Sequence, residues 1–156
     1  MKKIITLLAI ALVGALSFTS CNKDKEETDE ITNTMEIRGS KLPVTMAIYA
    51  IYDDYVNFDM DAGKEESNLH GYGGFPKSYI GKTTQLKDDF FMSYNPMQGS
   101  SINPVIKSGT VTVTQVSSNK LHVVVDAVET NGDKLLINCA VYDETKIDWN
   151  TFEYTK

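Results

Sequence analysis

The sequence predicts an all-β domain, and three observations support this prediction. In residues 35–156 no stretch keeps the 3.6-residue apolar period of an amphipathic helix for ten residues. Apolar and polar residues instead alternate with a period of two, and short turns that contain Gly, Asn or Ser separate the alternating segments. About seven or eight short strands at roughly ten-residue spacing are typical of an antiparallel sandwich or a small up-and-down barrel.

Residues 1–20 have the composition of a secretory signal peptide. Two lysines are followed by the apolar stretch Ile4–Leu16 of 13 residues, which is shorter than the roughly 20 residues that a membrane-spanning helix needs. A short run of mostly small residues then leads to Cys21 and resembles a bacterial lipobox, with Phe18 where the commonest version has Leu. The resemblance implies cleavage before Cys21 and a diacylglycerol on its thiol. Ordinary cleavage, with Cys21 as an incidental thiol, is the alternative.

Residues 21–34 are predicted to form an acidic, disordered tether. Asn22–Glu30 reads NKDKEETDE, with five carboxylates, two lysines and no aliphatic or aromatic side chain, so it cannot bury enough apolar surface to offset the entropy of ordering. An acidic run directly after a lipidated Cys resembles the export signal of Bacteroidota-type lipoproteins. This resemblance implies a lipid-anchored protein of the outer membrane that faces outward, and a plain solvated spacer is the alternative.

The charge balance excludes one class of partner. The chain has 15 basic and 21 acidic side chains, and removal of residues 1–20 takes two lysines and no acid, so the net charge changes from −6 to −8. Nucleic-acid binding needs clustered Lys and Arg, which the mature chain lacks. With Cys21 assigned to the lipid, Cys139 has no intramolecular disulfide partner and is expected to be buried and inert.

The first half of the domain contains several predicted strands. Val44–Tyr52 (VTMAIYAIY) is apolar on both faces, so it is predicted to be a central strand buried on both sides. A short buried helix is the alternative, but the β-branched residues and the preceding Pro43 favour a strand. Its predicted partner is Tyr55–Met60, after a turn at the two intervening aspartates. Shorter strands are predicted at Ser78–Ile80 and Asp89–Tyr94.

The second half predicts a three-stranded meander. The strict alternation of Thr110–Thr114 leads through a turn at Ser117–Asn119 to Lys120–Glu129, and Lys134–Tyr142 returns antiparallel. Between the last two strands, Asn131-Gly132 predicts a type I′ turn, in which both central residues have positive φ. One face of the middle strand should be apolar: Leu121, Val123, Val125 and Ala127. Trp149–Tyr154 is predicted to be the closing strand.

The order of these features resembles a known group of proteins. The lipobox and acidic tether are followed by an early strand, Ile80-Gly81-Lys82-Thr83 and the segment Ile106–Val113 that enters a hairpin. This order resembles small, uncharacterised Bacteroidota-type surface lipoproteins with a lipocalin-like or β-sandwich domain. The resemblance implies the fold and the location only, since that group has no agreed activity.

The segment 70–76 (HGYGGFP) is predicted to be a glycine-rich mobile loop. A phosphate cradle would need a helix after the glycines, and a Pro with a short β segment follows instead. The loop would present Tyr72 and Phe75 for stacking on a ligand, with His70 beside them. The alternative is that both rings fold back onto the core.

Candidate catalytic and metal-binding residues are weaker. His122 is expected on an exposed sheet face, too far from Asp126 for direct pairing, so no catalytic residue is predicted. Asp59, Asp61 and Glu65 lie in an acidic segment that superficially resembles a calcium loop. However, the Gly falls at position five rather than six and position 12 is not Glu. A solvated acidic hairpin is therefore the favoured interpretation.

These observations predict a non-enzymatic binding or structural module of the cell envelope, attached to the membrane through Cys21. The ligand classes left open are a glycan, a peptide and a small apolar molecule, and no cofactor, metal or nucleic acid is expected. A lipocalin-like carrier of an apolar ligand is one alternative function, and a hydrolase is another.

Overall fold

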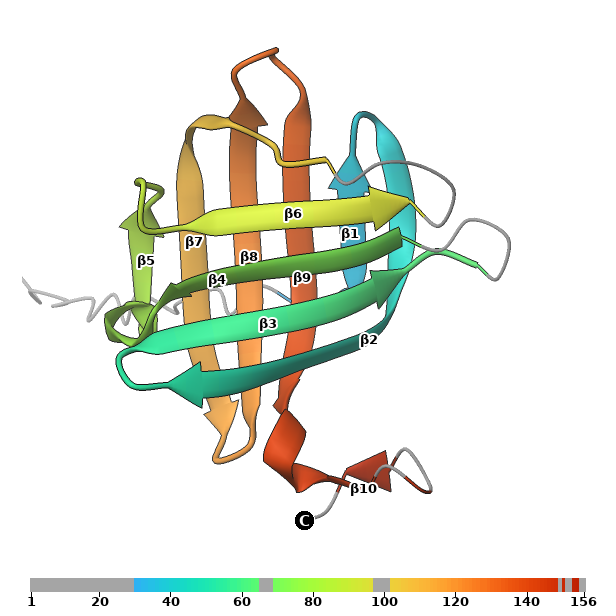
Figure 1. Ribbon diagram of the computed structural model, residues 1–156, viewed down its shortest axis with the longest axis vertical. Coiled ribbons are helices and arrows are strands. Elements are labelled where there is room, and N and C mark those ends of the chain that lie inside the picture. The colour runs from blue at the N-terminus through green and yellow to red at the C-terminus, as the bar shows by residue number, and fades with distance from the viewer. Residues whose placement is uncertain (1–29, 65–68, 97–101, 149, 151–152, 155–156) are drawn as a thin grey trace, which may run out of the picture.

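The computed structural model describes residues 30–64, 69–96, 102–148, 150 and 153–154. Over this part the main sheet has nine strands in the order β5-β7-β8-β9-β1-β2-β3-β4-β6. The sheet curls into a half-barrel in which two layers of strands cross each other (Figure 1). The all-β prediction is therefore confirmed, with more strands than the seven or eight expected.

Strand β2 joins the two layers. It pairs with β1 at its start and with β3 over the rest of its length, and an irregularity between Val44 and Met46 lies at the change of partner. Such irregularities bend a strand and let it pass from one layer to the other. The first layer consists of β1 (Thr34–Ile37), β9 (Lys134–Asp143), β8 (Lys120–Glu129), β7 (Ile106–Ser117) and β5 (Lys82–Gln85). The second consists of β2 (Ser40–Tyr52), β3 (Tyr55–Ala62), β4 (Leu69–Pro76) and β6 (Phe91–Pro96).

The hydrophobic core lies on the concave side, between the layers. Leu121, Val123, Val125 and Ala127 of β8 are at most 2% exposed, which confirms the apolar face predicted for this strand. From the second layer, Phe58, Met60 and Phe75 reach the same core and are also almost fully buried. Full burial of one such side chain contributes roughly 1.5–3 kcal/mol, so the two layers are held together mainly by apolar contact.

The hairpin predicted for β8 and β9 is confirmed, but the predicted type I′ turn is wrong. The strands pair from Lys120↔Tyr142 to Val128↔Lys134. Within the turn only Gly132 has positive φ (90°), and its N–H donates to the Glu129 carbonyl at 3.0 Å. A type I′ turn would also need positive φ at Asn131. The connection between the two strands is longer than two residues. Such a hairpin loop needs only one residue with positive φ, and Gly132 is that residue.

The prediction for Val44–Tyr52 is confirmed as a strand, but burial on both sides is restricted to its middle. Ala47, Ile48 and Tyr49 are buried, whereas Ile51 is 42% and Tyr52 60% exposed. The buried stretch is where β2 lies between β3 on one side and the end of β9 on the other. The tip of the β2–β3 hairpin extends beyond these neighbours and so remains in solvent.

Three further strand predictions need correction. Lys77–Tyr79 forms a short 3₁₀ helix, η1, because Tyr79 turns inward and its hydroxyl donates to Asp89 at 2.7 Å. The strand predicted at Asp89–Tyr94 begins and ends two residues later, as β6. After β9 the chain forms a second 3₁₀ helix, η2 (Glu144–Lys146), and a separate ribbon of β10 (Ile147–Asp148) with β11 (Glu153–Tyr154), so no described residue there closes the main sheet. Residues 149 and 151–152 of that prediction lie outside the described residues.

The mobile loop predicted at residues 70–76 is wrong, because this segment is strand β4 at the centre of the second layer. Large side chains of neighbouring strands pack close to the β4 backbone, and its glycines leave space for them. A Cβ atom on Gly73 would lie 2.5 Å from the ring of Phe58, and one on Gly71 would lie 2.9 Å from the side chain of Met60. Glycine inside a strand often marks such a close approach. Phe75 belongs to the core (0% exposed).

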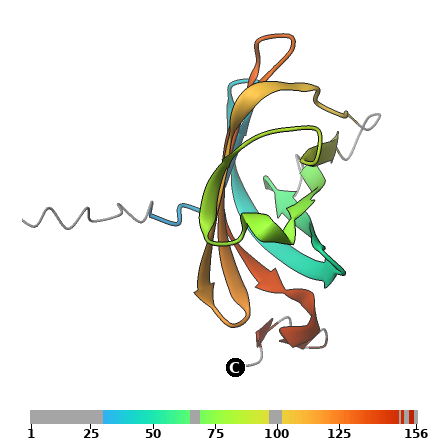
Figure 2. The same ribbon diagram turned by 90° about the vertical axis from the view of Figure 1, so that its left-hand side faces the viewer.

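The N-terminal end of the described chain lies on the outer face of the first layer (Figure 2). The Asn138 amide of β9 donates to the Glu30 carbonyl and accepts from the Thr32 N–H, both at 3.0 Å. These contacts fall in the last part of the predicted tether 21–34. They also help to explain why His122 is buried (5% exposed) and not exposed as predicted, since its Nε2 is 3.0 Å from the same Asn138 oxygen. In the part of the chain that the structure describes, no helix is long and apolar enough to cross a membrane.

Candidate functional site

The outer face of the second layer gathers most of the polar and aromatic side chains that are candidates for function. Along β3 the alternation buries Val56, Phe58 and Met60 and turns the intervening residues outward. Cross-strand pairing then sets these outward residues into rows. Asp59 lies between Ile48 of β2 and Tyr72 of β4, and Asp61 lies beside His70 of β4. Residues far apart in the sequence thereby share one surface.

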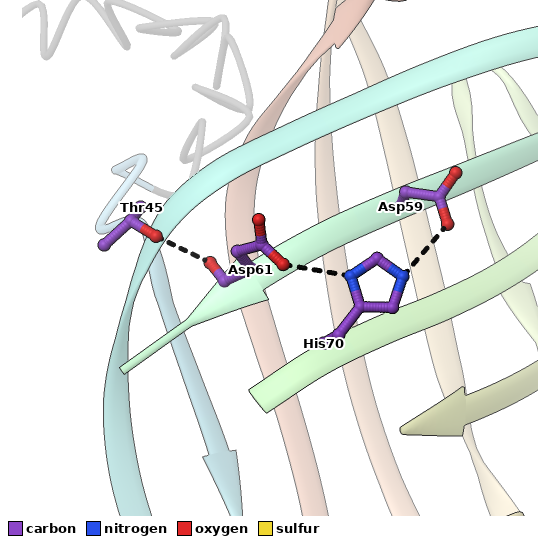
Figure 3. A network of polar contacts seen from close by, with 4 residues as sticks. All are labelled: Thr45, Asp59, Asp61 and His70. Carbon is purple, nitrogen blue, oxygen red and sulfur yellow. Dashed lines mark hydrogen bonds and ion pairs between the residues drawn. The ribbon is translucent and has the colours of Figure 1, made fainter. Parts of the chain in front are cut away.

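His70 lies between two carboxylates (Figure 3). Its Nδ1 is 2.9 Å from Asp61 Oδ1, and because an ionised carboxylate only accepts, Nδ1 donates in this hydrogen bond. Its Nε2 is 3.7 Å from Asp59 Oδ1, which is an ion-pair distance but too long for a hydrogen bond. The three side chains are 37–51% exposed, so the network contributes little to stability. It places the imidazole between the two aspartates on the surface.

The two aspartates differ in their electrostatic environment. Partial burial raises the pKa of Asp59 above its ordinary value, and the nearby Asp61 raises it further, while His70 acts in the opposite direction. Asp61 is tied to its surroundings by the bond to His70, and its backbone carbonyl accepts from the Thr45 hydroxyl at 3.2 Å. Asp59 is therefore the carboxylate that would gain more from a further positive partner.

Exposed aromatic rings adjoin this network. Phe91 of β6 stacks on Tyr55 of β3 with ring centroids 6.0 Å apart, and the tilted ring of Tyr72 has its centroid 5.2 Å from that of Phe91. The floor beneath the stack is Gly74, where a Cβ atom would lie within 2.8 Å of both the Tyr55 and Phe91 rings. Tyr72 is 41% and Phe91 37% exposed. The cluster therefore presents ring surface to solvent.

A cavity of about 220 Å³ lies beside the cluster, where η2 approaches β2. Side chains or backbone of four elements line it: Ile48, Tyr49, Ala50 and Tyr52 of β2, Asn57 and Asp59 of β3, Tyr72 of β4, and Glu144 of η2. The cavity is open to solvent and includes two carboxylates and three tyrosines. We call this cavity, with the adjoining Phe91 and Tyr55 rings, the outer-face site.

Of the three residues predicted from the sequence to contact a ligand, two lie at or beside this site and one does not. Tyr72 lines the cavity and His70 contacts its Asp59, whereas Phe75 points to the opposite side of the sheet and is wrong as an exposed ligand contact. Asp59 and Asp61 lie on a strand with His70 between them rather than on a calcium loop. Glu65 lies outside the described residues. Among the described residues no group of three or more His, Cys, Asp and Glu is arranged to hold a metal ion.

Several residues of the outer-face site were not predicted. Period-two alternation over Tyr55–Asp61 places Tyr55 and Asn57 on the same face as Asp59, so the sequence carried a signal for these two residues. Phe91 could have been found once β6 was placed beside β4. Glu144 had no such signal, because η2 reaches the cavity only through the crossing of the layers.

A second polar group lies away from this face. Glu129 of β8 and Tyr94 of β6 are each 3% exposed, and among the described residues neither Glu129 Oε1 nor the Tyr94 hydroxyl has a hydrogen-bond partner. Burial raises the pKa of Glu129, the Arg38 guanidinium lowers it, and Asp133 raises it. Burial also raises the pKa of Cys139 to about 12, which agrees with the inert thiol expected from the sequence.

Comparison with known proteins gives no relative from which a function could be inferred. No protein-family model, no curated protein and no solved structure matches the chain.

Proposed function

We propose that the chain is a lipid-anchored protein of the cell envelope, displayed on the outer membrane, whose β domain binds a ligand at the outer-face site. The lipobox-like segment before Cys21 and the acidic run after it support the anchor and the location. The observation that carries the binding role is the open cavity of about 220 Å³ beside an exposed aromatic cluster. Pockets that combine ring surface with a few polar groups are typical of ligand-binding sites.

A non-catalytic role agrees with the chemistry of this face. His70 is the natural general base there. Its Nδ1 donates to Asp61, which leaves Nε2 as the nitrogen that could accept a proton, and Nε2 faces the Asp59 carboxylate at 3.7 Å. Acid–base catalysis through a nucleophile would need the histidine to accept a proton from that nucleophile. The Cys139 thiol lies on the other side of the sheet in the core and is fully buried. Binding therefore has more support than hydrolysis.

A surface site also has more support than an interior carrier site. On the concave side the described side chains pack against one another, and the largest, such as Phe58 and Phe75, are at most 1% exposed. Ligand contacts on the outer face need no such side chain to move.

The binding role can be tested on arrays of glycans and peptides with the full-length chain in detergent. Tyr72→Ala should weaken whatever binding the wild type shows, because it removes exposed ring surface from the site. Val105→Ala is the matched control, since Val105 is 65% exposed and does not line the cavity. Equal binding by wild type and Tyr72→Ala would place the site elsewhere, and turnover of an arrayed compound would overturn the non-catalytic role.

A further inference from the structure

The groups that line the cavity of the outer-face site select for positive charge. Asp59 and Glu144 are its two ionisable carboxyl groups, and no Lys or Arg is among the residues that line it. Ionised carboxylates accept hydrogen bonds and cannot donate them. A ligand that fills the cavity must therefore bring donors of its own, and a negatively charged group there would be repelled.

The tyrosine rings of the cavity also attract positive charge. Tyr52 and Tyr72 border the cavity and are 60% and 41% exposed, so their rings can be covered by a ligand. The face of a tyrosine ring attracts a cation, by about 0.5–1 kcal/mol at exposed sites. The carboxylates and rings that line the cavity thus act together on an organic cation, whereas a neutral ligand gains from the rings alone.

Asp59 is the natural anchor for such a cation. Its carboxylate is partly desolvated, and the imidazole beside it, that of His70, is shared with Asp61 and lies 3.7 Å away. A donor placed in the cavity would give this carboxylate a hydrogen bond that it does not make to His70.

Size and ligand number distinguish between kinds of cation. At about 220 Å³ the cavity is smaller than the roughly 300–1,000 Å³ of pockets that hold whole small molecules, so it suits one functional group. A metal ion is a poorer match, because Ca²⁺ takes six to eight oxygen ligands and the cavity offers two carboxylates with aromatic walls.

We propose that the cavity binds the alkylammonium or guanidinium group of an organic cation, held by hydrogen bonds to Asp59 and Glu144 and by the rings of Tyr52 and Tyr72. This inference rests on the proposed binding function and specifies the chemistry of the ligand. It also agrees with the charge of −8 on the chain after residue 20, which favours approach of cations.

The test uses small probes on the full-length chain in detergent, followed by the NMR shifts of backbone amides in β2, β3 and η2. Nα-acetyl-lysine amide and Nα-acetyl-arginine amide carry the two proposed groups. Nα-acetyl-norleucine amide has a similar aliphatic chain without the charge, and choline is a cation with no N–H to donate. We expect saturable shifts around Asp59 and Glu144 with the lysine or arginine probe, and at least about tenfold weaker binding of the norleucine probe.

Variants identify the carboxylate responsible. Asp59→Asn should weaken binding of the cationic probe about tenfold or more. Asp61→Asn is the matched control, because it lies on the same strand and face and contacts His70 but does not line the cavity; it should bind within about twofold of wild type. Amide spectra that match wild type away from β3 establish that both variants are folded.

The outcomes separate this inference from the binding function on which it rests. Equal affinity for the lysine and norleucine probes, equal effects of the two Asp variants, or binding of choline alone would overturn the cation proposal. If binding to an arrayed ligand is still lost in Tyr72→Ala, the binding function stands while the cation proposal fails. If neither the arrays nor the probes detect binding at this face, both are refuted.

Discussion

Gly73→Ala tests the packing that makes residues 70–76 a strand. The added Cβ would lie 2.5 Å from Cζ of Phe58 and 2.9 Å from the carbonyl oxygen of Phe91. Neither atom can give way easily, because Phe58 is 1% exposed and the carbonyl belongs to the neighbouring strand β6. Such overpacking costs about 1–3 kcal/mol, and the lower entropy of the unfolded chain returns only about 0.4–1 kcal/mol.

We therefore expect Gly73→Ala to lower the free energy of unfolding by about 1–2 kcal/mol. Gly71→Ala is the matched control on the same strand and the same face. Its Cβ would meet the side chains of Met60 at 2.9 Å and Met92 at 3.2 Å. These flexible chains can adjust, so its stability should stay within about 0.5 kcal/mol of wild type.

Urea unfolding followed by circular dichroism measures both variants on the full-length chain. An unchanged m-value would show that the difference lies in stability rather than in the compactness of either state. If Gly73→Ala were as stable as wild type, the contact with Phe58 would be wrong, and residues 70–76 could again be considered a loop.

Three further predictions concern titratable groups and the anchor. Glu129→Gln should be more stable than wild type at pH 7 by about 1–3 kcal/mol. Burial raises the pKa of Glu129 above its usual 4.5, so the wild type loses stability as the pH rises through that raised pKa. The charged or titratable groups that face Glu129 are Arg38, Asp133 and Tyr94. The advantage should vanish in urea unfolding below about pH 4.5, and a pH-independent difference would contradict this explanation. The Cys139 thiol, with a pKa of about 12 in place of 9.0, should react with iodoacetamide at pH 8 about a thousandfold more slowly than a free thiol; rapid labelling of folded Cys21→Ala protein would refute it. Cys21→Ala itself should remain folded yet lose palmitate labelling and membrane association in a bacterial host, and persistent labelling would exclude Cys21 as the lipid site.

Local patterns in the sequence were sufficient to predict most of the first layer. Alternation over Lys120–Glu129 and Lys134–Tyr142 identified both strands and the buried face of the first, because side chains on a strand alternate between faces whatever surrounds them. The segments that failed were those in which a distant partner determines the conformation. The glycine-rich sequence of β4 is typical of a loop, and only the packing of Phe58 and Met60 against these glycines explains why it is a strand. Strands β1 and β5 are too short to show an alternating pattern.

The outer-face site was predictable to the same limited degree. His70 and Tyr72 were predicted as ligand contacts, but the residues that line the cavity with Tyr72 come from three other elements, β2, β3 and η2. Phe75 was assigned to solvent because a loop has no fixed face, whereas the strand sends it to the core and Tyr72 outward. Glu144 could not be found from local sequence at all, since η2 is brought to β2 by the parallel pairing of the end of β9 with β2.

The position of residues 30–33 determines how the domain would stand on a membrane. They lie against β9 on the outer face of the first layer (Figure 2), and the outer-face site is on the second layer, on the opposite side of the molecule. With the proposed lipid on Cys21, eight residues lie between the anchor and Glu30, and the nine Cα-to-Cα steps span at most about 30 Å. An anchor at Cys21 would thus be joined to the domain on the side opposite the outer-face site, and the proposed binding site would then face away from the bilayer.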